Sequence, residues 1–360
     1  MTSNSNIKKP FDPSQLKVEV KNTTIRALCD MLENDMIDLQ PDFQRHANLW
    51  SDTKKSRFVE SLILGIPIPS MFFYVDYGSK KWIVIDGLQR LCALRDFMVD
   101  QTLALHGLEF TQHEGSMFGE FSYFERLEMM MRDVTLNIIS GEASKEAIYL
   151  IFKRLNSEGL SLRPAEIRNA LYHGDGMDFV KKLAEGDAFK NVIHDKVSTK
   201  RMMHYDFVAR FISFHHFGYR DYPQNGSMDT FLGDALTYFN KSDSLSLFAN
   251  IQRDFYRSLD MCVQLLGQDV FRSPNKKQND KKRSNPISIA LFEAMMCSVS
   301  HLTDVEMRLL LDRASRYRAL YFDLFKDKDL EKLLSQGTGK RKSVIYRFEQ
   351  MEQIVKTTLS

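Results

Sequence analysis

Hydrophobic and polar positions in the first part of the chain follow two periods, one typical of strands and one typical of helices. Short apolar runs bounded by turn residues predict strands over 16–20, 71–75, 82–85, near 102–105 and over 134–139. Apolar residues at helical spacing predict helices that begin at Thr23 or Thr24, at Ser51 or Asp52, and at Leu91. The second and third of these strands are close enough to form a hairpin. The pattern therefore predicts a small mixed sheet surrounded by helices.

The second part of the chain has a helical period almost throughout. Ser144 is a candidate cap for a helix that ends near Gly159, and Pro164 suits the first turn of a helix that ends near Gly174. Beyond residue 175 the apolar and aromatic positions keep helical spacing. We therefore expect an α+β chain with a flexible tail over 1–13, a mixed-sheet domain over 14–142 and a mainly α-helical domain over 143–360.

Composition and charge are those of an ordinary soluble protein. Hydrophobic residues make up 43% and charged residues 27% of the 360 residues, and the formal net charge is +2. A balance so close to neutral argues against strong binding of nucleic acid by the whole molecule. We find no apolar stretch of membrane-spanning length and no signal peptide in the polar N-terminus, so we expect a cytoplasmic protein. The four cysteines lack metal-ligand spacing and are expected to be reduced.

The segment Asp86-Gly87-Leu88-Gln89-Arg90, which we name the DGLQR turn, follows a predicted strand and opens a predicted helix. Backbone N–H groups at a helix start attract anions, and an arginine in the same turn matches phosphate oxygens. Asp86 and Gln89 are suited to hold a magnesium ion or to orient a water. An Asp-Gly pair is also an ordinary turn signal, and an arginine in a first helical turn is often only solvated. The turn by itself leaves both interpretations open.

Three blocks of sequence occur in a fixed order around this turn. The first is Phe43-Gln44-Arg45, followed by Trp50 and by the run ESLILGIPIP over 60–69. The second is the DGLQR turn, and the third is the run IFKRLNSEGLSL over 151–162. Together the blocks resemble the N-terminal domain of the GmrSD-type restriction proteins (domain of unknown function 262). That family is placed in the ParB/sulfiredoxin-like superfamily and carries a DGQQR signature; the similarity spans roughly residues 14 to 172.

The resemblance implies nucleotide chemistry. Members of this family bind and hydrolyse nucleoside triphosphates, and several act in bacterial defence against phage. The resemblance implies that the catalytic residues are Asp86, Gln89 and Arg90, with Asp86 as the ligand of Mg²⁺. Leu88 departs from the signature, where glutamine is usual, so the role of that side chain in placing water is missing here. Binding of the nucleotide is therefore expected to survive this change more safely than hydrolysis.

The same resemblance supplies the remaining residues of the expected site. The nucleotide-binding residues that it implies are Gln44, Arg45, Gly87, Arg154 and Asn156. Of these, Gln44 and Arg45 would form the wall opposite the DGLQR turn, and Gly87 would allow close approach of the ligand. Arg154 and Asn156 also have an ordinary interpretation, because asparagine is common at a helix end and a cation is favourable there.

Other candidate sites have weaker signals. The segment over 272–286 is strongly basic and bracketed by prolines, which is typical of an exposed loop and is also suited to phosphate contacts with DNA. The basic run over 339–343 lacks the earlier glycine of a Walker motif, so we reject that interpretation. His215 and His216 are adjacent and therefore point in different directions on a helix. No histidine-rich nuclease motif is recognised.

Three functions from different classes remain open. A nucleoside triphosphatase would use the DGLQR turn for Mg²⁺-dependent hydrolysis and regulate a restriction or anti-phage system. A non-hydrolysing nucleotide switch would reorganise the helical domain and recruit a partner. A DNA-binding adaptor would use the basic loop and recruit a separate effector nuclease. The base of the nucleotide, the identity of the partner and the oligomeric state have no signal that we recognise.

Overall fold

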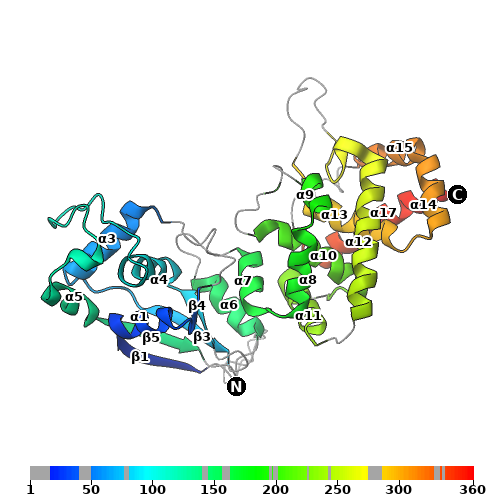
Figure 1. Cartoon of the computed structure of the whole chain (residues 1–360). Helices are drawn as coiled ribbons and strands as arrows, with labels where there is room; N and C mark the ends of the chain where they lie inside the picture. The colour runs from blue at the N-terminus through cyan, green and yellow to red at the C-terminus, as the bar shows by residue number, and fades with distance from the viewer. Residues whose placement is uncertain are drawn as a thin grey trace, which may run out of the picture. The chain divides into compact units, whose positions relative to one another are not determined.

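The computed structural model has two compact units, Met1–Leu171 and Tyr172–Ser360, which we name unit 1 and unit 2 (Figure 1). The structure describes residues 17–39, 50–76, 81–139, 145–155, 163–193, 197, 202–224, 227–241, 245–274, 286–327, 333–334 and 337–360. Unit 1 combines a sheet with helices, and the described part of unit 2 is helical. The predicted α+β class is therefore confirmed.

Unit 1 is built on a five-stranded mixed sheet with the strand order β1-β5-β3-β4-β2. The strands are β1 (Val18–Thr24), β2 (Ile37–Asp38), β3 (Met71–Asp76), β4 (Lys81–Asp86) and β5 (Asp133–Ile139). The pairs β1–β5 and β3–β4 are antiparallel, and the pairs β3–β5 and β2–β4 are parallel. The predicted hairpin is β3–β4, and it delivers the DGLQR turn at the end of β4.

The helices of unit 1 cover both faces of this sheet. They are α1 (Ile25–Glu33), α3 (Asp52–Ile63), α4 (Leu88–Leu94) with its continuation η2 (Arg95–Val99), η3 (Phe118–Glu120), α5 (Tyr123–Met130), α6 (Lys145–Leu155) and α7 (Pro164–Leu171). Phe73 and Leu136 point to one face and join a core with α1, α3 and α4. Ile83 and Ile85 are buried on the other face, where α6 contacts β4. Both α6 and α7 belong to unit 1, and the domain limits predicted at 13 and 142 remain predictions.

Local signals in the sequence placed the starts of two helices correctly. Thr24 caps α1, where its side chain accepts a hydrogen bond from the Ala27 N–H group at 3.3 Å. Ser51 caps α3 and accepts a hydrogen bond from the Lys54 N–H group at 3.4 Å. Each oxygen satisfies one of the N–H groups that the first turn of a helix leaves without a partner.

The strand predicted near 102–105 is wrong. Leu103 and Leu105 are buried in the core, which explains their alternating pattern, but the backbone there pairs with no strand in the described part of the chain. The N–H groups of Thr102 and Leu103 donate instead to Asp96 O at 2.7 and 3.1 Å. Alternating burial therefore reflects a loop that passes over the core.

Glu60 fixes the long connection between η2 and α5. Its side chain is only 3% exposed, and its carboxylate accepts hydrogen bonds from the backbone N–H groups of Glu109, Phe110 and Thr111 at 2.8 to 3.1 Å. The backbone N–H bonds lower the pKa of Glu60 despite the opposing effect of burial. A helix side chain thus supplies the hydrogen bonds that the loop does not make with itself.

Unit 2 contains α8 (Asp175–Ala184), α9 (Asp187–Ile193), α10 (Met203–Phe217), α11 (Met228–Phe239), α12 (Leu245–Leu266), η5 (Gly267–Asp269), α13 (Ile289–Ser300), α14 (Asp304–Asp312), α15 (Ala314–Leu324) and α17 (Arg341–Leu359). The helix end predicted near Gly174 is wrong, because α7 ends at Leu171 and Gly174 precedes the first residue of α8 with φ +132°. Within the described ranges, no helix has the length and apolar character needed to cross a bilayer.

The centre of unit 2 contains a buried ionic cluster. Glu293 on α13 and Arg347 on α17 are both fully buried and form an ion pair. Arg210 on α10 donates to the other oxygen of Glu293 at 3.0 Å, and Arg347 also donates to Thr338 O at 2.7 Å. One carboxylate thus links three helices, and its single negative charge is shared between two arginines whose burial would otherwise be more costly.

Candidate functional site

The DGLQR turn is a change from strand to helix at a glycine. Asp86 ends β4, Gly87 has φ +105°, and α4 begins at Leu88. A Cβ atom at Gly87 would lie 2.9 Å from Met71 Cγ, so both the backbone angle and the lack of space favour glycine here. The Leu91 N–H group donates to Gly87 O at 2.9 Å and closes the first helical turn.

A register shift in the hairpin lies next to the turn. Phe72 pairs with Asp86 whereas Phe73 pairs with Val84, so Ile85 is an extra residue on β4. Such bulges redirect the side chains around them and are frequent beside functional sites. Here Ile85 is 1% exposed, while the Asp86 side chain that follows it is 39% exposed. The shift therefore lies between a core residue and the accessible carboxylate.

Arg90 connects the turn to the segment that precedes β3. Its guanidinium donates to Pro69 O, to Ser70 O at 3.3 Å and to Asp86 Oδ2 at 2.9 Å. The Arg90 side chain is 12% exposed. Burial lowers its pKa, and the Asp86 carboxylate opposes this effect. Arg90 is thus a partly buried cation held by one carboxylate and two carbonyl groups, rather than a solvated surface charge.

Some hydrogen-bonding capacity of this pair stays available for a ligand. The Nε–H group and one hydrogen of Nη1 on Arg90 have no partner among the residues that the structure describes. Within the same ranges, Asp86 Oδ1 has none either. The pair can therefore present two N–H donors and one carboxylate oxygen without breaking the bonds that hold it.

Gln89 and Leu88 point to protein groups. Gln89 Oε1 accepts a hydrogen bond from the Trp50 N–H group at 3.0 Å, which attaches the residue just before the cap of α3 to the DGLQR turn. Leu88 is partly buried and packs against the core of unit 1. Position 88 is therefore occupied by a packing residue.

The other predicted site residues are only partly described. Gln44, Arg45 and Asn156 lie outside the described residues, so their expected place opposite the turn remains a prediction. Arg154 is an exposed residue in the last turn of α6, the helix that contacts β4. The structure thus brings together Asp86, Gly87, Gln89 and Arg90 in one turn, and it places Arg154 on a neighbouring helix of the same unit.

Asp86 fits one mode of magnesium binding. The described part of the chain has no group of three or more His, Cys, Asp and Glu residues arranged to hold a metal ion. Mg²⁺ is commonly held by one or two carboxylates together with substrate phosphates and waters. A single accessible carboxylate with one available oxygen agrees with that mode and not with a site made only of protein ligands.

Three groups that hold the DGLQR turn in place are not among the residues that the sequence predicted for the site. The carbonyl oxygens of Pro69 and Ser70 hold Arg90, and the side chain of Met71 leaves room only for glycine at position 87. Backbone acceptors have no residue signature, so a motif search does not find them. The run of alternating prolines over 66–69 was the available signal, because it predicts an extended segment whose carbonyl groups are not used by a helix.

Residues 27–173 match the model of the N-terminal domain of the GmrSD restriction endonuclease. No curated protein and no solved structure is significantly similar to the chain. The matched range contains the β3–β4 hairpin, the DGLQR turn and helix α6. Residues 27–173 of this chain are therefore similar to the N-terminal domain of the GmrSD restriction endonuclease.

Proposed function

We propose that unit 1 binds a nucleoside triphosphate at the DGLQR turn and hydrolyses it with Mg²⁺, as a regulatory part of a restriction or anti-phage system. The observation that supports this most directly is the pair of Arg90 and Asp86 at the end of β4. A partly buried guanidinium beside an accessible carboxylate combines an anion-binding group with a magnesium ligand. The family match supports the link to restriction.

Each residue of the turn has a role in this proposal. Arg90 keeps its bonds to the carbonyl groups of Pro69 and Ser70 and donates its remaining N–H groups to phosphate oxygens. Gly87 gives the turn the positive φ that leads from β4 into α4, and Met71 already fills the space where a Cβ atom would stand. Asp86 would hold Mg²⁺, which when bound neutralises charge on the phosphate oxygens.

Gln89 acts in this proposal by positioning. Its Oε1 atom holds the Trp50 backbone, so it connects the start of α3 to the turn. A ligand that displaced the Trp50 N–H group from Gln89 would free this amide for the water-orienting role that the sequence suggests. Trp50 is therefore a natural reporter of occupancy at the DGLQR turn.

A second candidate function is favoured by Leu88. A leucine side chain has no polar group that could orient a water molecule, and Leu88 packs against the core. Nucleotide binding without turnover would then act as a switch. The two candidates share the ligand and differ only in whether phosphate is released.

The test uses the full chain with ATP, GTP, CTP and UTP in the presence of Mg²⁺, and measures phosphate release and calorimetric binding. Asp86→Asn and Arg90→Ala are compared with two matched control variants, Asp100→Asn and Arg95→Ala, at the two ends of η2. Arg95 and Asp100 form an ion pair of similar length, 3.2 Å, that is 29% and 42% exposed. Retained tryptophan fluorescence and circular dichroism confirm that every variant is folded.

Hydrolysis that falls roughly 10²-fold in Asp86→Asn and Arg90→Ala but not in the controls supports the triphosphatase. Binding that depends on Arg90 without phosphate release supports the switch. Absence of binding for all four nucleotides, or equal loss in the control variants, would overturn both.

A further inference from the structure

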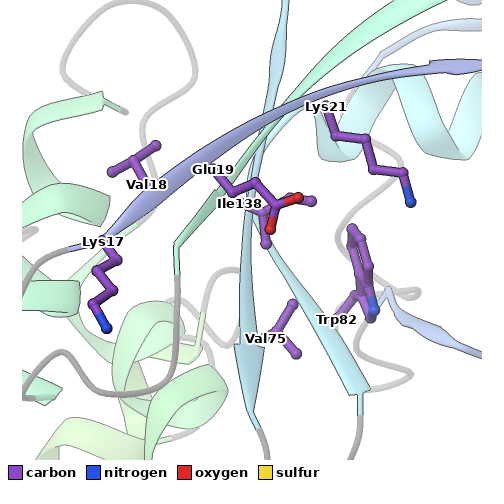
Figure 2. Close-up of a pocket in the computed structure, with 7 residues that line it drawn as sticks. All are labelled: Lys17, Val18, Glu19, Lys21, Val75, Trp82 and Ile138. Carbon is purple, nitrogen blue, oxygen red and sulfur yellow. The ribbon is translucent and has the colours of Figure 1, made fainter.

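A hollow opens on the sheet of unit 1 (Figure 2), and it lies at the opposite end of β4 from the DGLQR turn. Trp82 lies near the start of β4, whereas Asp86 ends that strand. The volume of the hollow is about 470 Å³, which is within the range of about 300–1,000 Å³ typical of small-molecule sites. Its lining residues are Lys17, Val18, Glu19, Lys21, Val75, Trp82 and Ile138.

The floor of this hollow is apolar and comes from three adjacent strands. Three side chains point to the same face of the sheet: Val75 on β3, Trp82 on β4 and Ile138 on β5. Val75 pairs with Trp82, and Phe73, two residues before Val75 and therefore on the same face, pairs with Ile138. Val75 and Trp82 are only partly buried where they pack against the core of unit 1. The ring of Trp82 is held by Phe73, whose centroid lies 5.6 Å away in an edge-to-face arrangement. The core thus reaches the surface here and presents an oriented indole.

The rim of the hollow is charged. Glu19 and Lys21 on β1 pair with Ile138 and Leu136, so their side chains point to the core face of the sheet. Figure 2 shows both side chains extending over the hollow towards Trp82. Their backbones belong to the β1–β5 ladder, but neither the Glu19 carboxylate nor the Lys21 ammonium group has a hydrogen bond or an ion pair with any residue that the structure describes. A carboxylate and an ammonium group are therefore available above an apolar floor.

Protection of an edge strand explains only part of this arrangement. β1 is at the edge of the sheet, and charged side chains that point inward are a known means of preventing edge-to-edge pairing. Edge protection accounts for the charges on β1. It does not account for the Trp82 indole on β4. This ring is only partly buried although β4 is an inner strand of the sheet, where burial of an aromatic ring would be favourable.

We propose that this hollow is a binding site for a small molecule that combines a planar ring with an anionic group. The ring stacks on Trp82, the anion pairs with Lys21, and an N–H group of the ligand donates to Glu19. A nucleoside monophosphate has all three features, and it is the ligand that we commit to. Aromatic carboxylates also combine a planar ring with an anionic group, and they are the alternative class of ligand.

The two tryptophans of the chain separate this site from the DGLQR turn. Trp50 and Trp82 are the only tryptophans in the sequence. Trp50→Phe leaves Trp82 as the single fluorophore in the hollow, and Trp82→Phe leaves Trp50, whose N–H group is bonded to Gln89 at the turn. The proposal does not depend on nucleotide binding at the turn, so each site can fail without the other.

The experiment titrates the Trp50→Phe full chain with AMP, GMP, CMP and UMP, and in parallel with benzoate, nicotinate and inorganic phosphate. Saturable quenching of Trp82 by the nucleotides, weakened at least about tenfold by Lys21→Ala and by Glu19→Gln, supports the proposal. Arg90→Ala should leave this signal unchanged. Lys54→Ala, which removes an exposed lysine of α3 that does not line the hollow, serves as the matched control.

The remaining outcomes are equally decisive. If the aromatic carboxylates quench Trp82 as strongly as the nucleotides do, the hollow binds ring-bearing anions but is not a nucleotide site. Three results overturn the proposal: no saturable change with any ring-bearing anion, an equal effect of inorganic phosphate alone, or equal affinity in the Lys21→Ala chain. A Trp82 that acrylamide does not reach would overturn it as well, because the ring would then be covered.

Discussion

Arg90 and Asp86 make unequal contributions to the stability of unit 1, and three substitutions separate them. Arg90→Ala removes the bonds to Pro69, Ser70 and Asp86 together. Arg90→Lys keeps the charge, but an ammonium group does not reproduce the planar fork that serves several acceptors at once. Asp86→Asn leaves both carbonyl bonds in place. We expect the loss of unfolding free energy to decrease in that order.

The magnitudes follow from exposure. Hydrogen bonds to a charged group contribute about 1.5–3 kcal/mol each when they are shielded from water. The Asp86 carboxylate is 39% exposed, so we discount its pair with Arg90 to about 0.5 kcal/mol. The Arg90 side chain is only 12% exposed, so its hydrogen bonds to the carbonyl groups of Pro69 and Ser70 supply most of its contribution to stability. We expect losses of about 3 kcal/mol for Arg90→Ala, about half of that for Arg90→Lys, and about 0.5 kcal/mol for Asp86→Asn.

The assay uses the distribution of tryptophan. Both tryptophans lie in unit 1, so fluorescence in a urea titration follows the unfolding of unit 1 alone, whereas circular dichroism follows both units. This separation matters because a chain of two units need not unfold in one step. For a unit of this size, about 3 kcal/mol corresponds to a shift of the melting temperature of roughly 6–12 °C.

Arg95→Ala provides the control, since its ion pair with Asp100 is more exposed than that of Arg90. It should change stability by about 0.5 kcal/mol or less. Equal losses for Asp86→Asn and Arg90→Ala would refute the reasoning, because the carboxylate and not the carbonyl groups would then hold the guanidinium. A loss below about 0.5 kcal/mol for Arg90→Ala would refute it too.

Three further predictions concern other parts of the fold. Gly87→Ala should destabilise unit 1 by about 2 kcal/mol through its positive φ and its contact with Met71. The same substitution should cost less in a Met71→Ala chain, measured against Met71→Ala alone because that change itself opens a cavity in the core; an equal cost in both chains would contradict the contact. Glu293→Gln leaves buried arginine charge uncompensated and should cost unit 2 about 3–5 kcal/mol, measured by circular dichroism with the fluorescence transition unchanged; a small shift would contradict it. Burial, and then the charge of His301, lower the pKa of His215 to about 4. The folded state therefore binds the proton less readily than the unfolded chain does. The full stability of unit 2 is present above about pH 6.5, and about 3 kcal/mol of unfolding free energy is lost as the pH falls towards 4. His215→Phe should flatten that part of the curve, and an unaltered slope would contradict the assignment.

Local structure could be predicted because its signals are local. Thr24 and Ser51 cap their helices through a side-chain oxygen next to the first turn, and the β3–β4 hairpin joins two apolar runs separated by few residues. The sheet order was not predictable in the same way, since β1 pairs with a strand more than a hundred residues later. The buried loop near Leu103 and Leu105 was mistaken for a strand because burial and pairing leave the same alternating pattern.

The candidate site was predictable in part for a similar reason. Asp86, Gly87 and Arg90 are neighbours in sequence, so a motif places them together. The groups that hold Arg90 in the structure are carbonyl oxygens of Pro69 and Ser70, about twenty residues earlier, and any residue type supplies such an oxygen. Trp50 is likewise bonded to Gln89 through its backbone N–H group, which any residue type except proline supplies.

The pairing of β1 with β5 has a consequence for synthesis of the chain. Val18 lies opposite Ile139, so β1 leaves the ribosome long before the strand that it pairs with. Until then β3 also lacks the parallel neighbour that separates it from β1. Nascent fragments that stop before Asp133 cannot complete the sheet. A shortened version of unit 1 made for crystallisation or binding studies therefore has to extend past Ile139.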